Sequence, residues 1–423
     1  MIIKNGHVID PGTGTDGIFD VLIKDGKIVN IGNVTDADEE VIDASGLYVL
    51  PGFVDMHVHF RDPGFEYKET VGTGSKAAAR GGYTTVCTMP NTKPVMDCPS
   101  HLKLQLDKIK NEAVINVLPV GAVTMGQEGK ELSDISGMKK LGICAISEDG
   151  KSVMDSGLYE KAMKIARLEG LPVLAHCEDK NLVAKGALNA GAVAARIGVP
   201  GITNSVEDII AVRDVMLAKD TGAQLHLCHC STEDSVRIVK EGKEAGVRLS
   251  AEVCPHHFTL TEDDIPGDDA NYKMNPPLRK RRDVEALKKG LKDGIIEVIS
   301  TDHAPHSAEE KAKGIAQAPF GIVGLETAFA LSVTELLRGG VLTKAELVKC
   351  MSTNPARILG IEAGTLKEGA PADIVVVSFD ESYIIDSKEF ASKGKNTPFD
   401  GRKVYGKVKK TICGGRVVYS EGE

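Results

Sequence analysis

The sequence lacks several features that would place it in a specialised class. It has no run of about 18 apolar residues, so no segment predicts a membrane-spanning helix. It has no Lys/Arg block and a formal net charge of -9, so neither nucleic acid nor an anionic membrane is an expected partner. None of its 9 cysteines forms a CxxC pair. The start, "MIIKNGHVIDPG", turns polar too early for a signal peptide, and together these features predict a cytoplasmic protein with free, buried thiols.

The composition is that of a globular protein, and the two ends of the chain resemble each other. The 423 residues are 42% hydrophobic and 26% charged, enough for one large domain and a smaller one. Near the start, "DVLIKDGKIVNIG" predicts a hairpin turning at Asp25-Gly26, and near the end "VKKTICGGRVVYS" predicts one turning at Gly414-Gly415. We therefore expect a small discontinuous β-sandwich domain built from residues 1–50 and 361–423, with residues 51–360 inserted between them.

The inserted segment alternates between short apolar runs and helix-like stretches. The runs are rich in β-branched residues and end in polar ones, and the stretches between them often close with glycine, a common helix end. Eight such alternations predict an α/β fold of the TIM type, a (β/α)₈ barrel. The alternative is an open doubly wound sheet, which normally carries a Gly-rich phosphate turn after its first strand, whereas here that strand ends in histidines. The eight runs cover residues 53–60, 84–91, 114–121, 142–149, 172–179, 224–231, 248–255 and 296–303.

Polar side chains fall at the ends of these expected strands, where barrel enzymes carry their reactive groups. His57 and His59 alternate along one strand, so both point to the same side with Cα atoms roughly 6–7 Å apart. Side chains from other strand ends should converge on the same mouth. Four histidines and two carboxylates suit zinc, which binds nitrogen and oxygen ligands and leaves a position for water in catalytic sites. The expected metal ligands are His57, His59, Asp149, His176, His229 and Asp302.

Other histidines and cysteines have plainer interpretations. A lone histidine at a strand end is more often a structural residue than a ligand. We expect structural roles for His7, His101, His226 and His303, and we assign no role to the pair His256 and His257. Three cysteines are sequence neighbours of expected ligands, so strand alternation should point them away from the site; they are Cys177, Cys228 and Cys230.

Taken together, the motifs resemble those of the amidohydrolase superfamily and, within it, the dihydroorotases common in bacteria. The resemblance covers essentially the whole chain. Its most specific motifs are the first and seventh, and the one at 354–360 points only to the superfamily. The motifs are "DMHVHFRDPG" (55–64), "TMPNT" (88–92), "SEDG" (147–150), "AHCED" (175–179), "CHCST" (228–232), "NPPLR" (275–279), "STDHAPH" (300–306), "NPARILG" (354–360) and "NTPFDG" (396–401).

The resemblance implies roles for the site residues. His57, His59 and Asp302 would bind one zinc, and Asp149 would help to hold it. His176 and His229 would bind a second. Many relatives have a carboxylated lysine where Asp149 stands here, and Lys151 lies two residues too late to replace it. Substrate contacts are expected from Arg61, Asn91, Asn275, His306, Pro319, Phe320 and Gly321.

Arg61 is the residue that points to a particular substrate. Dihydroorotate and its open form, N-carbamoyl-L-aspartate, each carry an α-carboxylate, to which a guanidinium offers a planar, bidentate match. The alternative interpretation is a surface ion pair between Arg61 and Asp62 or Glu66.

The activity implied is the reversible, zinc-dependent cyclisation of N-carbamoyl-L-aspartate in pyrimidine biosynthesis. Asp302 would take a proton from water and return it to the leaving nitrogen. The alternatives are a hydantoinase- or allantoinase-type enzyme and a silent subunit that scaffolds aspartate transcarbamoylase. In addition to the small-molecule substrate, a homodimer is expected, and a complex with aspartate transcarbamoylase is a further candidate. Residues 307–324, "SAEEKAKGIAQAPFGIVG", are expected to form either a lid over the substrate or a plain solvated loop.

Overall fold

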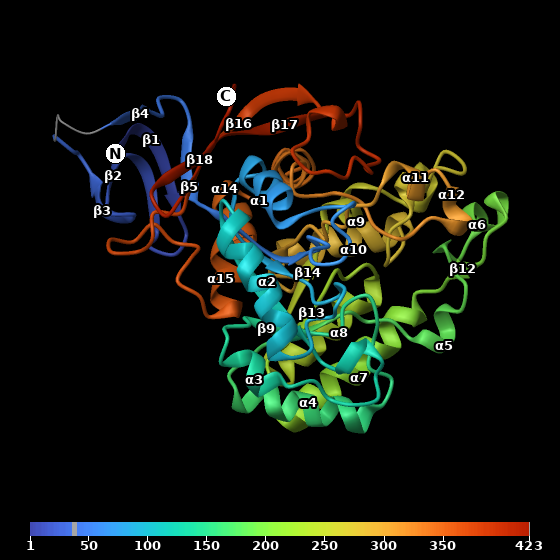
Figure 1. Ribbon diagram of the computed structural model, residues 1–423. Helices are drawn as coiled ribbons and strands as arrows, with labels where there is room; N and C mark the ends of the chain where they lie inside the picture. The colour runs from blue at the N-terminus through green and yellow to red at the C-terminus, as the bar shows by residue number, and fades with distance from the viewer. Residues whose placement is uncertain (36–39, 423) are drawn as a thin grey trace.

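The computed structural model describes residues 1–35 and 40–422 and contains a nearly closed barrel of eight parallel strands (Figure 1). The order β6-β7-β8-β9-β10-β13-β14-β15 follows the chain. The barrel closes where the His59 amide donates to the His303 carbonyl at 2.8 Å. The expected barrel is thus confirmed. Its strands are β6 (Phe53–Val58), β7 (Tyr83–Thr88), β8 (Asn116–Ala122), β9 (Ala145–Ser147), β10 (Val173–Ala175), β13 (Leu225–Leu227), β14 (Leu249–Val253) and β15 (Val298–Ile299).

Helices surround the barrel, and those expected from the sequence are present. Helix-like stretches between the expected strands form α1, α4, α8 and α10, and α1 and α8 begin at capping boxes of Thr70 and Thr232. No helix within the described residues is both long and apolar enough to span a membrane. The helices are α1 (Val71–Arg80), α2 (Pro99–Glu112), α3 (Ile135–Lys139), α4 (Ser156–Leu168), α5 (Lys180–Val183), α6 (Ala192–Ile197), α7 (Ser205–Thr221), α8 (Glu233–Glu244), α9 (Pro255–Thr259), α10 (Arg281–Lys292), α11 (Ala308–Lys311), α12 (Gly314–Gln317), α13 (Ala328–Ser332), α14 (Lys344–Val348) and α15 (Asn354–Leu359).

Both ends of the chain contribute to a second, mixed sheet. Its order is β18-β17-β16-β5-β1-β2-β3, with β4 paired to β1, so blue and red strands lie side by side in Figure 1. Both expected hairpins are confirmed, with positive φ angles at Asp25 (50°) and Gly26 (72°) and at Gly414 and Gly415. The strands are β1 (Ile2–Asp10), β2 (Thr15–Lys24), β3 (Lys27–Gly32), β4 (Val41–Asp43), β5 (Tyr48–Pro51), β16 (Ile374–Ile384), β17 (Lys403–Cys413) and β18 (Arg416–Ser420), and a separate pair joins β11 (Leu188–Asn189) to β12 (Gly201–Ile202).

A packed apolar cluster lies in the barrel on the amino-terminal side of the polar strand ends. It takes side chains from most strands, among them Val54, Val120, Leu174 and Val298, and it includes Ile358 of α15. All of these are buried. Because the cluster precedes the polar residues along each strand, the polar groups have an apolar floor and can open only toward the carboxyl-terminal mouth.

Candidate active site

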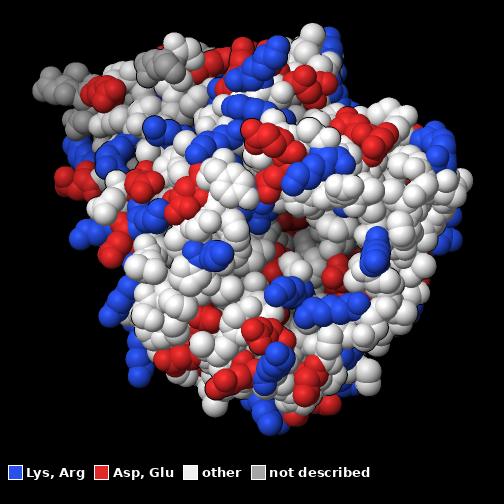
Figure 2. All heavy atoms as spheres, turned by 45° about the vertical axis from the view of Figure 1, so that its right-hand side comes forward, with Lys and Arg blue, Asp and Glu red and all other residues white. Residues whose placement is uncertain are grey.

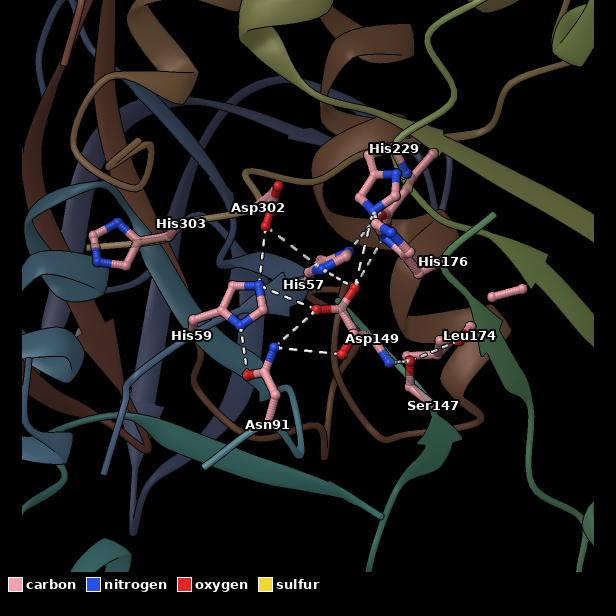
Figure 3. Close-up of polar contacts among 12 residues, drawn as sticks. His57, His59, Asn91, Ser147, Asp149, Leu174, His176, His229, Asp302 and His303 are labelled. Atoms are coloured by element: carbon pink, nitrogen blue, oxygen red, sulfur yellow. Dashed lines mark hydrogen bonds and ion pairs between the residues drawn. The ribbon is translucent and has the colours of Figure 1, made fainter. Parts of the chain in front are cut away.

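Side chains from five strand ends converge at the mouth of the barrel. His57 lies on β6, His59 just after it, and Asp149, His176, His229 and Asp302 follow β9, β10, β13 and β15. Figure 3 shows the six groups pointing toward one another around Asp149. All six are 7% exposed or less. The structure therefore brings together every metal ligand expected from the sequence, whereas their binding of a metal stays a prediction.

Asp149 lies between two pairs of histidines. Its Oδ1 is 3.1 Å from His57 Nε2, and its Oδ2 is 3.4 Å from His59 Nε2. On the other side, Oδ1 is 3.7 Å from His176 Nδ1 and 3.9 Å from His229 Nε2. Two groups with metal-ligand spacing thus share this carboxylate, one with His57 and His59 and the other with His176 and His229. Lys151 is exposed and donates to the Gln127 carbonyl, away from the cluster.

Asp302 completes the cluster from the closing edge of the barrel. Its Oδ1 lies 3.0 Å from His59 Nε2 and 3.6 Å from His57 Nε2. Within the described residues its Oδ2 has no hydrogen-bond partner, so one oxygen remains for a proton or a ligand.

The backbone is strained at three positions of this mouth. Arg61, His229 and Asp302 have φ angles of 61°, 33° and 47°, a region that residues other than glycine rarely adopt. Such conformations persist only when the surroundings enforce them, and they concentrate at functional sites. Here they turn the chain as it leaves a strand, so that these side chains face the mouth.

Hydrogen bonds fix which nitrogen of each β6 histidine faces the cluster. His57 Nδ1 donates to Glu252 Oε1 at 2.8 Å, and His59 Nδ1 donates to Asn91 Oδ1 at 2.9 Å. Each Nε2 atom is then the ring nitrogen that faces Asp149 and Asp302 and that a metal ion could bind. Ligand histidines in metal sites use this arrangement, in which the remote N–H is held by a carboxylate or carbonyl oxygen.

Two of the atoms that face the centre of the cluster form no hydrogen bond with the described residues. They are His57 Nε2 and Asp149 Oδ1, and both are buried. Buried polar atoms without partners are costly, and a cation between them would satisfy both. The residues present therefore fit a divalent metal.

The charges of the cluster are mutually stabilised. Burial alone would raise the pKa of Asp149 and of Asp302, yet the neighbouring imidazoles, His57 foremost, hold both carboxyl pKa values below their usual range. Burial likewise opposes a charge on His57, but Asp149, Cys228 and Asp302 together outweigh it and the pKa of the imidazole is raised. Both carboxylates are thus ionised at neutral pH, the form that binds a cation.

Arg61 borders the same mouth and forms no ion pair with the described residues. Its Nε donates to the Pro305 carbonyl at 3.4 Å, and no carboxylate of the described residues lies within ion-pair distance of it. The alternative ion pair with Asp62 or Glu66 is not formed, because Lys108 contacts both, at 2.5 and 3.3 Å. Arg61 is partly buried and so presents an unpaired cation beside the cluster.

Most of the other expected substrate residues line a cavity of about 150 Å³ over the cluster. Asn91 and Asn275 reach it from different loops, and Asn275 also donates to Glu178 Oε2 at 2.5 Å. Phe320 and Gly321 line it, and neither Pro319 nor His306 does. The face turned forward in Figure 2 is hollowed near its centre, with acidic atoms inside and charges of both signs scattered around.

His306 lies behind Arg61 and holds the neighbouring loop. Its Nε2 donates to the Phe320 carbonyl at 2.7 Å, and its Nδ1 accepts from Lys68 Nζ at 3.1 Å. Burial, with Arg61 and Lys68 adjacent, holds the pKa of His306 far below its usual range, so the ring is neutral. His306 thus positions Phe320 at the cavity wall.

The segment after His306 is folded against its neighbours. It contains α11 and α12, and the buried Lys311 donates to the carbonyls of Ala270 (2.9 Å), Lys273 (3.3 Å) and Pro319 (3.0 Å). Glu310 bonds to Lys68 at 2.8 Å. Whether this segment moves as a lid stays a prediction.

Several histidines lie outside the cluster. His303 points away from it (Figure 3). His303 contacts Glu69 at 3.4 Å, and His226 contacts Ser250 and Glu252. His257 Nε2 donates to the Pro276 carbonyl, and burial lowers the pKa of both His256 and His257. His7 and His101 pair with Asp16 and Asp97.

One sequence expectation about orientation is wrong. Cys228 was expected to point away from the site, yet its thiol lies with His57 and Glu252 in a group whose ligand atoms are within 4.8 Å of one another. The physical reason is that β13 ends at Leu227, so side chains no longer alternate in the irregular turn that carries His229.

Two acidic residues near the cluster were not expected from the sequence. Glu252 lies inside β14 and bonds to His57, and Glu178 lies 3.8 Å from His176 Nε2. Glu178 follows His176 in "AHCED", a run of polar residues at a strand end that could have indicated it. Glu252 stands in "RLSAEVCP", where a charged residue inside a buried strand is the one signal available.

Comparisons with known proteins agree with this geometry. A family model described as "Dihydro-orotase-like" matches residues 46–235. A dihydroorotase from Pelotomaculum thermopropionicum is 49% identical over 422 residues, which cover 100% of this chain and 99% of that protein. One from Bacillus cereus (strain AH820) is 46% identical over 421 residues, which cover 99% and 98%.

Solved structures of related enzymes share the whole architecture. The L-hydantoinase (dihydropyrimidinase) from Arthrobacter aurescens superposes with a TM-score of 0.89 at 26% identity, covering 100% of this chain and 96% of that one. The dihydropyrimidinase from Brevibacillus agri NCHU1002 gives 0.88 at 26% identity, covering 100% and 95%. With full-length relatives near half identity and this barrel in common, the chain belongs to the dihydroorotase family.

Proposed function

We propose that this protein interconverts N-carbamoyl-L-aspartate and L-dihydroorotate, in the direction of ring closure during pyrimidine synthesis. The observation that carries the proposal is the unpaired Arg61 guanidinium beside a cluster of histidines and aspartates. A partly buried cation without an acidic partner is expensive unless a ligand supplies the negative charge. The α-carboxylate common to both compounds supplies it in the planar form that a guanidinium binds best.

The metal proposed for the cluster is zinc, as one or two ions. His57, His59, Asp149 and Asp302 would hold the first, and His176 and His229, sharing Asp149, would hold the second. Imidazole and carboxylate ligands in a buried, small site favour zinc among the common ions. When bound, zinc supplies a Lewis acid that makes water acidic near neutral pH and polarises a carbonyl.

The protein's own groups would then orient the substrate and move one proton. Arg61 binds the α-carboxylate, so that the ring carbonyl faces the cluster, and Asn91 and Asn275 limit the ring's rotation in the cavity. In hydrolysis, Asp302 takes the proton of the attacking water and returns it to the ring nitrogen as the amide bond breaks. Ring closure reverses these steps.

Two alternatives differ from this proposal in testable ways. A hydantoinase- or allantoinase-type enzyme would act on cyclic amides without the carboxylate, which leave Arg61 unpaired. A silent subunit that scaffolds aspartate transcarbamoylase would need neither metal nor turnover. The homodimer and the transcarbamoylase complex stay predictions, which molar-mass measurements with and without that partner would test.

The position of the equilibrium should depend on pH. N-carbamoyl-L-aspartate carries two negative charges and dihydroorotate carries one, so closure consumes a proton. We expect the ratio of closed to open form to fall about tenfold for each pH unit, because one proton enters the equilibrium. Incubating the protein with either compound between pH 6 and pH 9 and quantifying both by chromatography measures this ratio.

Approach to the same ratio from both directions is the control for true equilibrium. A catalysed ratio that does not change between pH 6 and pH 9 would contradict the substrate assignment. Absence of any interconversion by zinc-loaded protein would contradict the activity itself.

A further inference from the structure

A buried glutamate on β14 contacts residues from both halves of the metal cluster. Glu252 is 0% exposed. Its Oε1 accepts from His57 Nδ1 at 2.8 Å and also from the backbone N–H of His229 at 3.2 Å. Its Oε2 faces His226 Nε2 at 3.1 Å. One oxygen atom therefore joins an expected ligand of the first metal position to an expected ligand of the second.

Each contact of Oε1 constrains a different degree of freedom. The bond to His57 holds Nδ1, so Nε2 is the ring nitrogen that faces Asp149. The bond to His229 holds the backbone where φ is 33°, a strained value that needs support from the surroundings. The imidazole of His229 is then aimed at the cluster, with Nε2 2.8 Å from His176 Nδ1.

We infer that Glu252 is a positioning residue that sets both metal positions at once, by holding the His57 ring and the His229 backbone with a single carboxylate oxygen. The inference rests on the metal site of the proposed function. Carboxylates behind ligand histidines are known to affect metal affinity. In this chain one oxygen supports ligands on two strands, so the two positions should weaken together.

If Glu252 had only a structural role, that role would depend on Oε2, the oxygen that does not contact the metal-ligand histidines. Oε2 contacts His226, whose Nδ1 lies 2.8 Å from Ser250 Oγ, and this pair lies away from the cluster. If Glu252 serves to satisfy this buried chain of polar groups, metal affinity should follow the integrity of that chain. Ser250→Ala interrupts the chain at its far end and leaves Oε1 unchanged, so it is the matched control.

Two conservative variants separate hydrogen-bond geometry from charge. Glu252→Gln keeps the length and can place its amide oxygen at the Oε1 position, while its amide nitrogen donates to His226. Glu252→Asp keeps the charge but is one methylene shorter, so its carboxylate cannot reach both donors from a fixed strand. Zinc affinity is measured by competition with a chromophoric chelator, and ligand geometry by the visible absorption of the cobalt(II) form.

We expect Glu252→Asp to bind zinc about tenfold more weakly than wild type at both positions and to show an altered cobalt(II) spectrum. Glu252→Gln and Ser250→Ala should stay within about threefold of wild type. Equal affinity of the Asp and Gln variants, or a weaker Gln variant, would overturn the inference. Circular dichroism of each metal-free variant checks the fold.

Failure of this inference differs from failure of the proposed function. Wild-type protein that binds no zinc would remove the metal site itself. Wild-type protein that binds zinc, with a Glu252→Asp variant that binds it equally well, would remove the role of Glu252 alone.

Discussion

Replacing Arg61 with methionine is expected to lower kcat/KM for L-dihydroorotate by roughly 10²–10³. Methionine removes the charge but keeps much of the length and the apolar contacts. Truncating one partner of a buried, hydrogen-bonded charge pair costs about 3 to 4 kcal/mol, which corresponds to that loss. Steady-state kinetics in the hydrolytic direction, followed by the loss of dihydroorotate absorbance, measure it.

Two comparisons make the Arg61 result specific. Arg61→Lys keeps the charge and the same backbone preference at the strained φ but lacks the planar fork, so its loss should be intermediate. Turnover of the uncharged cyclic amide hydantoin should change little, because hydantoin has no carboxylate to pair. An equal loss on dihydroorotate, hydantoin and allantoin would show that Arg61 does not select the substrate.

The second large effect is expected at Asp302. Asp302→Asn should lower kcat by about 10³-fold, since removing a positioned general base costs about 10² to 10⁴. Asparagine suits this test because it has nearly the same shape and tolerates the positive φ of 47° at this position. Single-turnover kinetics separate the chemical step from product release.

Zinc content must be measured in the same sample, because Asp302 is also an expected metal ligand. With His57, His59 and Asp149 unchanged, we expect the Asn variant to keep zinc while losing turnover. An Asn variant with wild-type kcat would exclude Asp302 as the proton acceptor. A variant that loses zinc and recovers full turnover at high zinc concentration would limit Asp302 to a ligand role.

The barrel could be predicted from the sequence because its strands are buried on both faces. Such strands read as short β-branched runs, and several runs here carry polar residues near their ends, as "FVDMHVHF" and "IEVISTDH" illustrate. The lengths of the strands could be predicted less well from the sequence. The run at 224–231 contains a strand of three residues, Leu225–Leu227, because the chain turns sharply before His229.

The candidate site, too, could be predicted only in part from the sequence. Ligands at strand ends could be anticipated, since parallel strands bring their carboxyl ends to one mouth. The partners of Glu252 could not be anticipated, because His57 and His229 are distant from it in sequence and meet it only through the closed sheet. The direction of the Cys228 side chain was predicted wrongly for a related reason. Side chains alternate between the two faces within a strand, and this alternation fails once the strand has ended.

The central claim is that six convergent side chains hold a metal on which ring opening depends. The most direct test measures zinc content and L-dihydroorotate turnover on one sample, before chelation, after chelation and after zinc is restored. We predict one or two zinc ions per chain, loss of turnover in proportion to zinc removed, and recovery when zinc is returned. Undiminished turnover by metal-free protein, or a full complement of zinc with no turnover of dihydroorotate, would contradict the claim.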